Sequence, residues 1–204
     1  MARAFLILHG IENRRPEGHW QRILAESLER RGERVIYPQL PVPDAPDYDE
    51  WVGALRGHLA ALGDGGERVA ICHSMSCLLW LKCAGTGKGV VDRLLLVSPP
   101  DSARLPPGGA DFRVDLPPGF DGEAVRASCR TAIRIACSDN DPYNPAGGGA
   151  MYAEPIGAEV DVLPGAGHIA MDEGYGPWAA VDEWCSDPSA RLRPADHQSG
   201  GIAR

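Results

Sequence analysis

The amino-acid sequence predicts an α/β fold in which helices cover both faces of a parallel sheet, a three-layer α/β/α sandwich. Two observations support this prediction. Short continuous apolar runs, which are typical of buried strands, alternate along the 204 residues with segments whose apolar residues recur at helical spacing. Single helices separate successive strands, and connections of this kind are right-handed crossovers between parallel strands.

The first half of the chain alternates regularly. Apolar runs predict buried strands at residues 4–8, 34–37, 68–72 and 91–97. Apolar residues at helical spacing predict helices that begin near Trp20, Trp51 and Met75. Gly32 and Gly63 follow the first two of these helices and favour their termination there. Four prolines between residues 38 and 46 predict an extended loop after the second strand.

The second half of the chain is less regular. Strands are predicted at residues 131–136 and 159–163, and a closing helix at about 175–185. The intervening helices have weaker patterns, because three glycines at 147–149 interrupt one of them. From Ser186 onward the chain is polar and contains glycine and proline, which is typical of a disordered end. We therefore expect one domain over residues 1–185 and a disordered tail over 186–204.

Composition and charge narrow the class of protein. A length of 204 residues suits one α/β core and is short for two domains. The formal net charge of -8 disfavours nucleic acid and anionic lipid as partners. No apolar run approaches the roughly 18 residues of a membrane span. The run at residues 5–8 is too short for the core of a signal peptide. A cytoplasmic location is the expectation.

The six cysteines predict neither a disulfide scaffold nor a metal site. They form no C-x-x-C pair. The sequence from Cys72 and His73 to Cys77 matches no usual zinc spacing. We expect buried thiols in the core and no bound metal.

Ser74 is the candidate nucleophile. It lies between the strand that ends at Cys72 and the helix that begins near Met75. A tight strand-to-helix turn exposes its central side chain above the sheet, in the pattern G-x-S-x-G. Here the five residues are Cys-His-Ser-Met-Ser, so Cys72 and Ser76 replace the glycines. Both replacements are small, as close packing of strand and helix requires. An ordinary helix N-cap is the alternative interpretation of Ser74.

A nucleophilic hydroxyl needs a base and an orienting carboxylate, and in this arrangement the order along the chain is Ser, then Asp or Glu, then His. The strand at 131–136 leads to Asp139 and Asp141. The strand at 159–163 leads through a glycine-containing loop to His168. We therefore expect His168 to be the base and favour Asp141 over Asp139 as the third member, since Asp139 can instead cap the turn.

Backbone groups are the candidates for an oxyanion hole. The expected donors are the N–H of Met75, directly after Ser74, and the N–H of Ile11, after the first strand. Gly10 would let the backbone approach closely. His9 is interpreted as a structural turn residue.

Several motifs together resemble the YdeN-like small serine hydrolases, a group of the α/β-hydrolase superfamily that includes the retinoblastoma-binding-protein hydrolase. The matches run from about residue 4 to residue 185. They are His9-Gly10, His19-Trp20, Pro41-x-Pro43-x-Ala45-Pro46 leading to Glu50-Trp51, Cys77-Leu78-Leu79-Trp80 after the elbow, Asp141-Pro142-Tyr143 and Gly167-His168-Ile169. Members of the group more often carry glycine where Ser76 stands.

The resemblance implies a shortened α/β-hydrolase core of about six parallel strands with no separate cap domain. It also implies a triad of Ser74, His168 and Asp141 that hydrolyses small esters or related acyl compounds without metal or organic cofactor. The partner would be a small-molecule acyl substrate, selected by loops at 12–18 and 99–119. Amide hydrolysis, thioester hydrolysis and a non-catalytic binding module are the alternatives. The sequence leaves the oligomeric state open.

Overall fold

The computed structural model describes residues 3–83, 87–105, 107–114, 121–146 and 148–196. Its centre is a six-stranded sheet with the order β2-β1-β3-β4-β5-β6, and every neighbouring pair is parallel. The strands are β1 (Arg3–Leu8), β2 (Arg34–Ile36), β3 (Glu67–His73), β4 (Val91–Val97), β5 (Cys129–Ser138) and β6 (Glu159–Leu163). The predicted parallel α/β architecture is confirmed.

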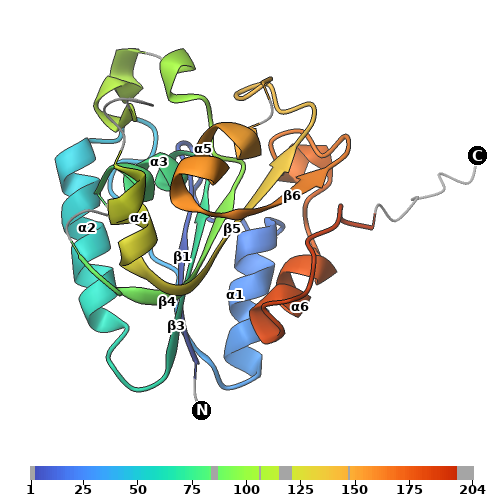
Figure 1. Cartoon of the computed structure of the whole chain (residues 1–204). Coiled ribbons are helices and arrows are strands. Elements are labelled where there is room, and N and C mark those ends of the chain that lie inside the picture. Colours follow the sequence, from blue (N-terminus) through green and yellow to red (C-terminus); the bar gives the residue numbers. More distant parts are fainter. Residues whose placement is uncertain (1–2, 84–86, 106, 115–120, 147, 197–204) are drawn as a thin grey trace, which may run out of the picture.

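Helices cover both faces of the sheet, with α1 and α6 on one face and α2 to α5 on the other (Figure 1). They are α1 (Trp20–Arg30), α2 (Tyr48–Ala61), α3 (Met75–Cys83), α4 (Gly122–Ser128), α5 (Gly148–Ile156) and α6 (Ala179–Ser186). Caps fix where some of them begin: the Asp47 carboxylate accepts a hydrogen bond from Glu50 N at the start of α2. Within the described ranges, no separate cap domain is present and no helix is long and apolar enough to cross a membrane.

Two apolar layers form the core, one on each side of the sheet. Strand residues alternate between the layers, as their period of two requires. In β1, Leu6 and Leu8 pack under α2 and α3, whereas Phe5 and Ile7 pack under α1 and α6, and all four side chains are fully buried. Since both faces of the strand are covered, β1 is the continuous apolar run seen in the sequence.

The end of the chain differs from the sequence-based expectation in two respects. Helix α6 begins only at Ala179, because Gly176 and Pro177 disfavour a helix over the preceding residues. Up to residue 196 the expected disordered tail is instead packed on the core. Leu192 is buried and its N–H donates to the Asp161 carboxylate at 2.9 Å. The rest of that expected tail, 197–204, lies outside the described residues.

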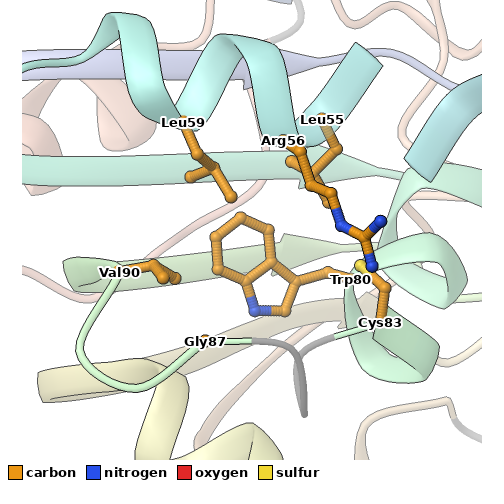
Figure 2. Close-up of a pocket in the computed structure, with 7 residues that line it drawn as sticks. All are labelled: Leu55, Arg56, Leu59, Trp80, Cys83, Gly87 and Val90. Atoms are coloured by element: carbon orange, nitrogen blue, oxygen red, sulfur yellow. The ribbon is translucent and has the colours of Figure 1, made fainter. Parts of the chain in front are cut away.

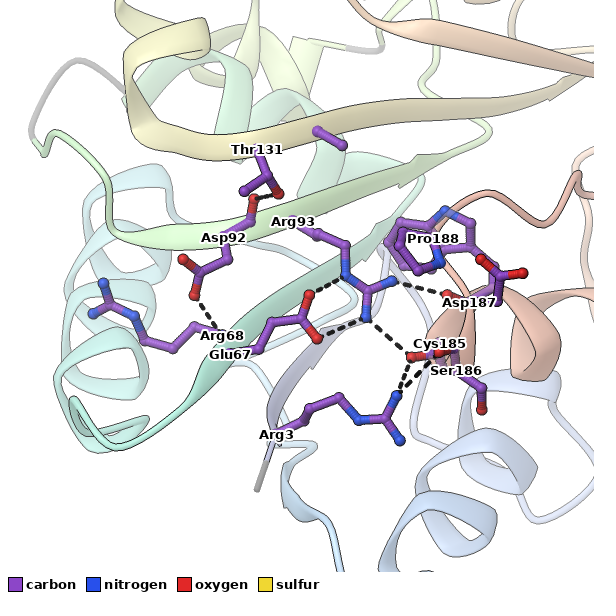
Figure 3. Close-up of polar contacts among 12 residues, drawn as sticks. Arg3, Glu67, Arg68, Asp92, Arg93, Thr131, Cys185, Ser186, Asp187 and Pro188 are labelled. Carbon is purple, nitrogen blue, oxygen red and sulfur yellow. Dashed lines mark hydrogen bonds and ion pairs between the residues drawn. The ribbon is translucent and has the colours of Figure 1, made fainter. Parts of the chain in front are cut away.

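A buried arginine of β4 links the first residue of β3 to the C-terminal end of α6 (Figure 3). The Arg93 side chain in β4 donates through Nε and Nη2 to the Glu67 carboxylate at 2.7 and 3.1 Å. It also donates to the backbone carbonyls of Trp184 and Cys185 at 2.8 and 3.0 Å. Arg3 donates to the same Cys185 carbonyl. Two guanidinium groups therefore stabilise the negative end of the α6 dipole.

The strand order alone indicates where in the sheet a functional site is expected. The chain moves outward from β1 to β2 and then returns to the other side of β1 to form β3. In open α/β sheets, ligands bind at the carboxyl ends of the strands where the order reverses in this way. The carboxyl ends of β1 and β3 carry Gly10 and Ser74 respectively.

Candidate active site

Ser74 occupies a sharp turn between β3 and α3. Its φ is +57°, in the left-handed region that a non-glycine residue adopts at a cost of about 1–3 kcal/mol. The turn is held because Ser74 N donates to the carbonyl of Val97 in the neighbouring strand at 2.9 Å. Gly10 lies directly against it: a Cβ at Gly10 would be 2.7 Å from Ser74 Cβ and 3.1 Å from its Oγ. The sequence-based reason for a glycine at this position therefore has a specific steric basis.

Ser76, which replaces a glycine of the usual elbow pattern, is built into the turn. Its fully buried hydroxyl accepts a hydrogen bond from His73 N at 2.9 Å. The same oxygen lies 2.9 Å from the carbonyl oxygens of Leu8 and His73, so its proton can be donated to either of them. The serine thus ties the elbow to the end of β1 instead of disturbing it.

The three side chains expected to form a triad lie within hydrogen-bond distance in the expected order. The Ser74 Oγ is 2.8 Å from His168 Nε2, and His168 Nδ1 is 2.8 Å from Asp141 Oδ2. Asp141 and His168 are both buried. Asp139, the other candidate carboxylate, does not contact the imidazole and instead accepts from Gly165 N at 2.7 Å.

The last residue of β5 and the three residues after it contact four consecutive residues that end at His168. Besides the Asp139 and Asp141 bonds, Ser138 Oγ accepts from Ala166 N at 3.0 Å and Asn140 Oδ1 accepts from Gly167 N at 2.7 Å. We call residues 138–141 and 165–168 the paired loops. Ser138 and Asn140 were not among the residues expected to form the site, and the only signal for them in the sequence is their place beside the candidate aspartates.

Glu173 fixes the backbone on the other side of the same histidine. Its Oε2 accepts from His168 N at 2.6 Å and from Ala170 N at 3.1 Å. A Cβ on Gly167 would lie 1.9 Å from the Glu173 carboxylate, and Gly167 also has a φ of +58°. Only glycine fits there. Glu173 was another residue that the sequence patterns did not reveal.

Three further histidines lie around the elbow in neutral form. Burial is the main cause in each case: it lowers the pKa of His9 below its ordinary value, that of His19 to about 4, and that of His73 far below it. His9 Nδ1 is 2.7 Å from the Gly10 carbonyl oxygen and His9 Nε2 accepts from Leu40 N. This network is consistent with the turn role expected for His9.

A cleft of about 840 Å³ opens above Ser74. Ser74 and His168 lie in its wall with Ile11 and Met75, the two residues whose N–H groups are the expected oxyanion donors. Both predicted substrate loops contribute to the cleft, although residues 106 and 115–120 of the second loop lie outside the described residues. The remaining lining residues are Gly10, Glu12, Asn13, Arg14, Pro16, His19, His73, Pro100, Asp101, Arg104, Leu105, Pro142, Tyr143, Ala170 and Asp172.

A second, smaller cavity of about 220 Å³ lies at the opposite end of α3 (Figure 2). Leu55, Arg56 and Leu59 of α2 line it, together with Trp80 and Cys83 of α3 and with Gly87 and Val90. Its walls are mainly apolar and contain none of the residues around Ser74.

The described residues offer no ligand set for a metal, since no three histidine, cysteine or acidic side chains are grouped suitably in that part of the chain. Cys72, Cys77 and Cys185 are buried thiols whose pKa burial raises. The Cys77 Sγ lies 3.4 and 3.3 Å from the backbone carbonyl oxygens of Cys72 and Val97. Cys72 and Cys77 belong to the core under the elbow, whereas Cys185 lies in the apolar layer on the other face of the sheet.

Comparison with protein families gives one match, to the serine hydrolase family, over residues 5–186. No curated protein matches the chain in sequence.

Solved structures similar to the chain include the YdeN gene product of B. subtilis. It has 19% identity and a TM-score of 0.75, with 91% of this chain and 97% of that one covered. A YdeN-like hydrolase from Pectobacterium atrosepticum, described as putative, has 21% identity, a TM-score of 0.67 and coverages of 89% and 88%. An esterase domain from Rhodothermus marinus has 16% identity, a TM-score of 0.64 and coverages of 89% and 85%. At these identities the likeness shows a shared α/β-hydrolase fold.

Proposed function

Because the chain belongs to the serine hydrolase family and is a hydrolase, we propose that it cleaves small esters or related acyl compounds through a triad of Ser74, His168 and Asp141. One observation carries this proposal. A continuous hydrogen-bond chain runs from Ser74 Oγ through both nitrogens of His168 to Asp141, with 2.8 Å at each step, and it opens on the cleft. Nucleophile, base and orienting carboxylate are thus aligned for acyl transfer.

The first step forms a bond between Ser74 Oγ and the substrate carbonyl carbon. His168 Nε2 removes the hydroxyl proton, while the Asp141 carboxylate keeps the other proton on Nδ1 and stabilises the imidazolium that forms. His168 then gives its proton to the leaving alcohol as the carbon–oxygen bond breaks. Water repeats the sequence on the acyl-enzyme, releasing the acid and restoring Ser74. No metal or organic cofactor takes part in these steps.

The negative charge of the tetrahedral intermediate needs donors already in place. We assign this role to the backbone N–H groups of Ile11 and Met75, two residues that line the cleft together with Ser74. The close approach of Gly10 to Ser74 brings the first of these segments against the nucleophile. Removing one such donor costs about 2.7–4 kcal/mol of transition-state stabilisation in other hydrolases.

The residues that line the cleft favour a neutral acyl substrate. Ile11, Met75 and Leu105 provide apolar surface, and the charged side chains around them include both signs. Both arginines that line the cleft are paired, Arg14 with Asp44 and Arg104 with Asp101. Because those cations already have acidic partners, they give weak attraction for a negatively charged substrate.

Labelling with a fluorophosphonate probe tests the proposal directly. The wild-type protein should react, and Ser74→Ala and His168→Ala should not. A panel of p-nitrophenyl esters of increasing acyl length, with the matching amide and thioester, then identifies the substrate class. A folded wild type that neither reacts with the probe nor turns over any of these compounds would refute the proposal and favour a non-catalytic binding module.

A matched pair of variants tests the assignment of the carboxylate. In Asp141→Asn the amide donates to Nδ1, so the imidazole carries its proton on Nε2 and no longer accepts one from Ser74. We expect kcat to fall by about 10⁴-fold, as in other triads. Asp139→Asn keeps an oxygen that accepts from Gly165 N, so kcat should stay near the wild-type value. Equal effects of the two changes would contradict the assignment. One hydrolase domain over residues 1–185 stays a prediction, and residues up to 196 pack on its core instead of belonging to a separate tail.

A further inference from the structure

His73, the residue before Ser74, contacts the backbone of the proposed base. Its Nε2 lies 3.0 Å from the carbonyl oxygen of His168, which can only accept a hydrogen bond, so the proton of this neutral ring is on Nε2. The other nitrogen, Nδ1, is buried without a hydrogen-bond partner in the described part of the chain. An unsatisfied buried acceptor costs about 1–3 kcal/mol. The histidine at this position therefore carries an energetic penalty.

Trp20, the first residue of α1, makes the equivalent contact one residue later. Its Nε1–H donates to the carbonyl oxygen of Ile169 at 3.0 Å. The indole packs edge-on against the His73 ring, with centroids 5.6 Å apart and an interplanar angle of 85°. Both rings are almost fully buried. Two neighbouring ring N–H groups therefore hold two consecutive carbonyls of the loop that carries His168.

The residue between these two contacts is strained. Ile169 has a φ of +54°, and for a β-branched side chain this left-handed conformation is a genuine outlier. Such strain costs about 1–3 kcal/mol and persists only where the surroundings hold the backbone. Ile169 N also donates to the Ala166 carbonyl at 3.1 Å, so the turn is tight. Relaxation of this turn would move the adjacent His168.

We propose that His73 and Trp20 are positioning residues: their ring N–H groups hold the strained turn at Ile169 and so keep the His168 imidazole between Ser74 and Asp141. This inference rests on the proposed function. Neither ring N–H reaches the reacting atoms. His73 acts through the His168 carbonyl and packs its ring against the imidazole, with centroids 5.3 Å apart, whereas Trp20 acts through the carbonyl of the next residue, Ile169. Burial keeps His73 neutral because it lowers the pKa of this side chain far below its ordinary value, so the contact does not depend on protonation at neutral pH.

Three variants remove or retain the donors. His73→Phe keeps a ring and deletes the N–H, whereas His73→Gln keeps an amide N–H at a similar distance from the backbone. Trp20→Phe deletes the second donor. The matched control is Trp80→Phe in the wall of the second cavity (Figure 2). Trp80 is buried to the same extent as Trp20, and it also donates from Nε1, here to Ser128 Oγ at 3.3 Å.

The readouts are kcat, KM, the rate of fluorophosphonate labelling and the free energy of unfolding. A misplacement of the order of 1 Å lowers rates by about 10²-fold. We expect His73→Phe to lose about 10–100-fold in kcat and labelling rate with little change in KM, and Trp20→Phe to lose about 10-fold. His73→Gln should recover most of the rate. Trp80→Phe should lose stability and keep the wild-type kcat.

The outcomes separate this inference from the proposed function. A folded wild type that neither labels nor turns over acyl substrates refutes the proposed function itself. If the wild type is active and His73→Phe and Trp20→Phe retain its kcat, the positioning role is wrong. It is equally wrong if Trp80→Phe loses as much kcat for each kcal/mol of lost stability as His73→Phe and Trp20→Phe do. Should His73→Phe fail to fold, the comparison of Trp20→Phe with Trp80→Phe decides the question.

Discussion

The serine at position 76 gives a sharp test of how the elbow is built, because a glycine is expected there. In Ser76→Ala the buried N–H of His73 loses its acceptor. The Leu8 carbonyl stays satisfied, since Gln21 Nε2 also donates to it at 2.9 Å. One orphaned buried donor costs about 1–3 kcal/mol. Ser76→Gly has the same defect and adds about 1 kcal/mol for a glycine in the first turn of α3.

Thermal unfolding and ester turnover measure these effects. For a protein of this size each kcal/mol shifts Tm by about 2–4 °C, so a loss of about 2 kcal/mol in Ser76→Ala lowers Tm by about 4–8 °C. Ser76→Gly should unfold at a lower temperature still. Turnover should fall in both variants, because Ser74 and His73 lie in the same turn. A Ser76→Gly protein with wild-type or higher Tm and kcat would refute this reasoning and show that the turn fits glycine better.

Two further predictions concern stability. Arg93→Met should lower the free energy of unfolding, measured by urea denaturation, by about 2–4 kcal/mol, because it removes the hydrogen-bond donors of the Trp184 carbonyl and the Glu67 carboxylate. A loss below about 0.5 kcal/mol, the level of ordinary surface changes, would contradict the idea that Arg93 holds α6 against the sheet. Burial lowers the pKa of His19 from 6.5 to about 4 and that of His73 well below 6.5, so below about pH 6.5 the unfolded chain binds more protons than the folded protein. The free energy of unfolding should therefore decrease as the pH falls below about 6.5, by up to about 1.4 kcal/mol per pH unit for each histidine. In His73→Gln the slope of this free energy against pH should be smaller, by the amount that corresponds to nearly one bound proton. An identical pH slope in the variant would show that His73 does not contribute.

Local signals in the sequence were enough to predict most of the sheet. The expected strands at 91–97 and 159–163 coincide with β4 and β6, because both are apolar runs with clear ends. Strand β5 extends to Cys129–Ser138, beyond the expected 131–136. Its polar ends are paired through contacts that the sequence does not show, such as Thr131 Oγ1 donating to the Asp92 carbonyl. The start expected for the closing helix, at about residue 175, was wrong: the apolar residues there follow helical spacing, but Gly176 and Pro177 disfavour a helix before Ala179.

The candidate site could be approached from the sequence only at the positions that follow strands. Ser74 and His168 stand out because each comes just after a buried run. The choice between Asp139 and Asp141 depends on which carboxylate faces the imidazole, and two residues of one turn cannot be separated by spacing. Glu173 escaped notice since its role depends on the path of a loop. The packing of residues up to 196 was unforeseen because a polar composition does not reveal the Asp161 acceptor that binds Leu192 N.

The paired loops set a limit on how this molecule can vary. Each side chain at 138–141 bonds to a different residue at 165–168, so the two segments keep a fixed register. Deleting or adding one residue in either segment would shift every partner at once and leave the imidazole beside the wrong side chain. Insertions are therefore excluded here, whereas loops that line the cleft without such pairing can change in length. Substrate preference can diverge in this architecture while the distance between Asp141 and His168 stays constant.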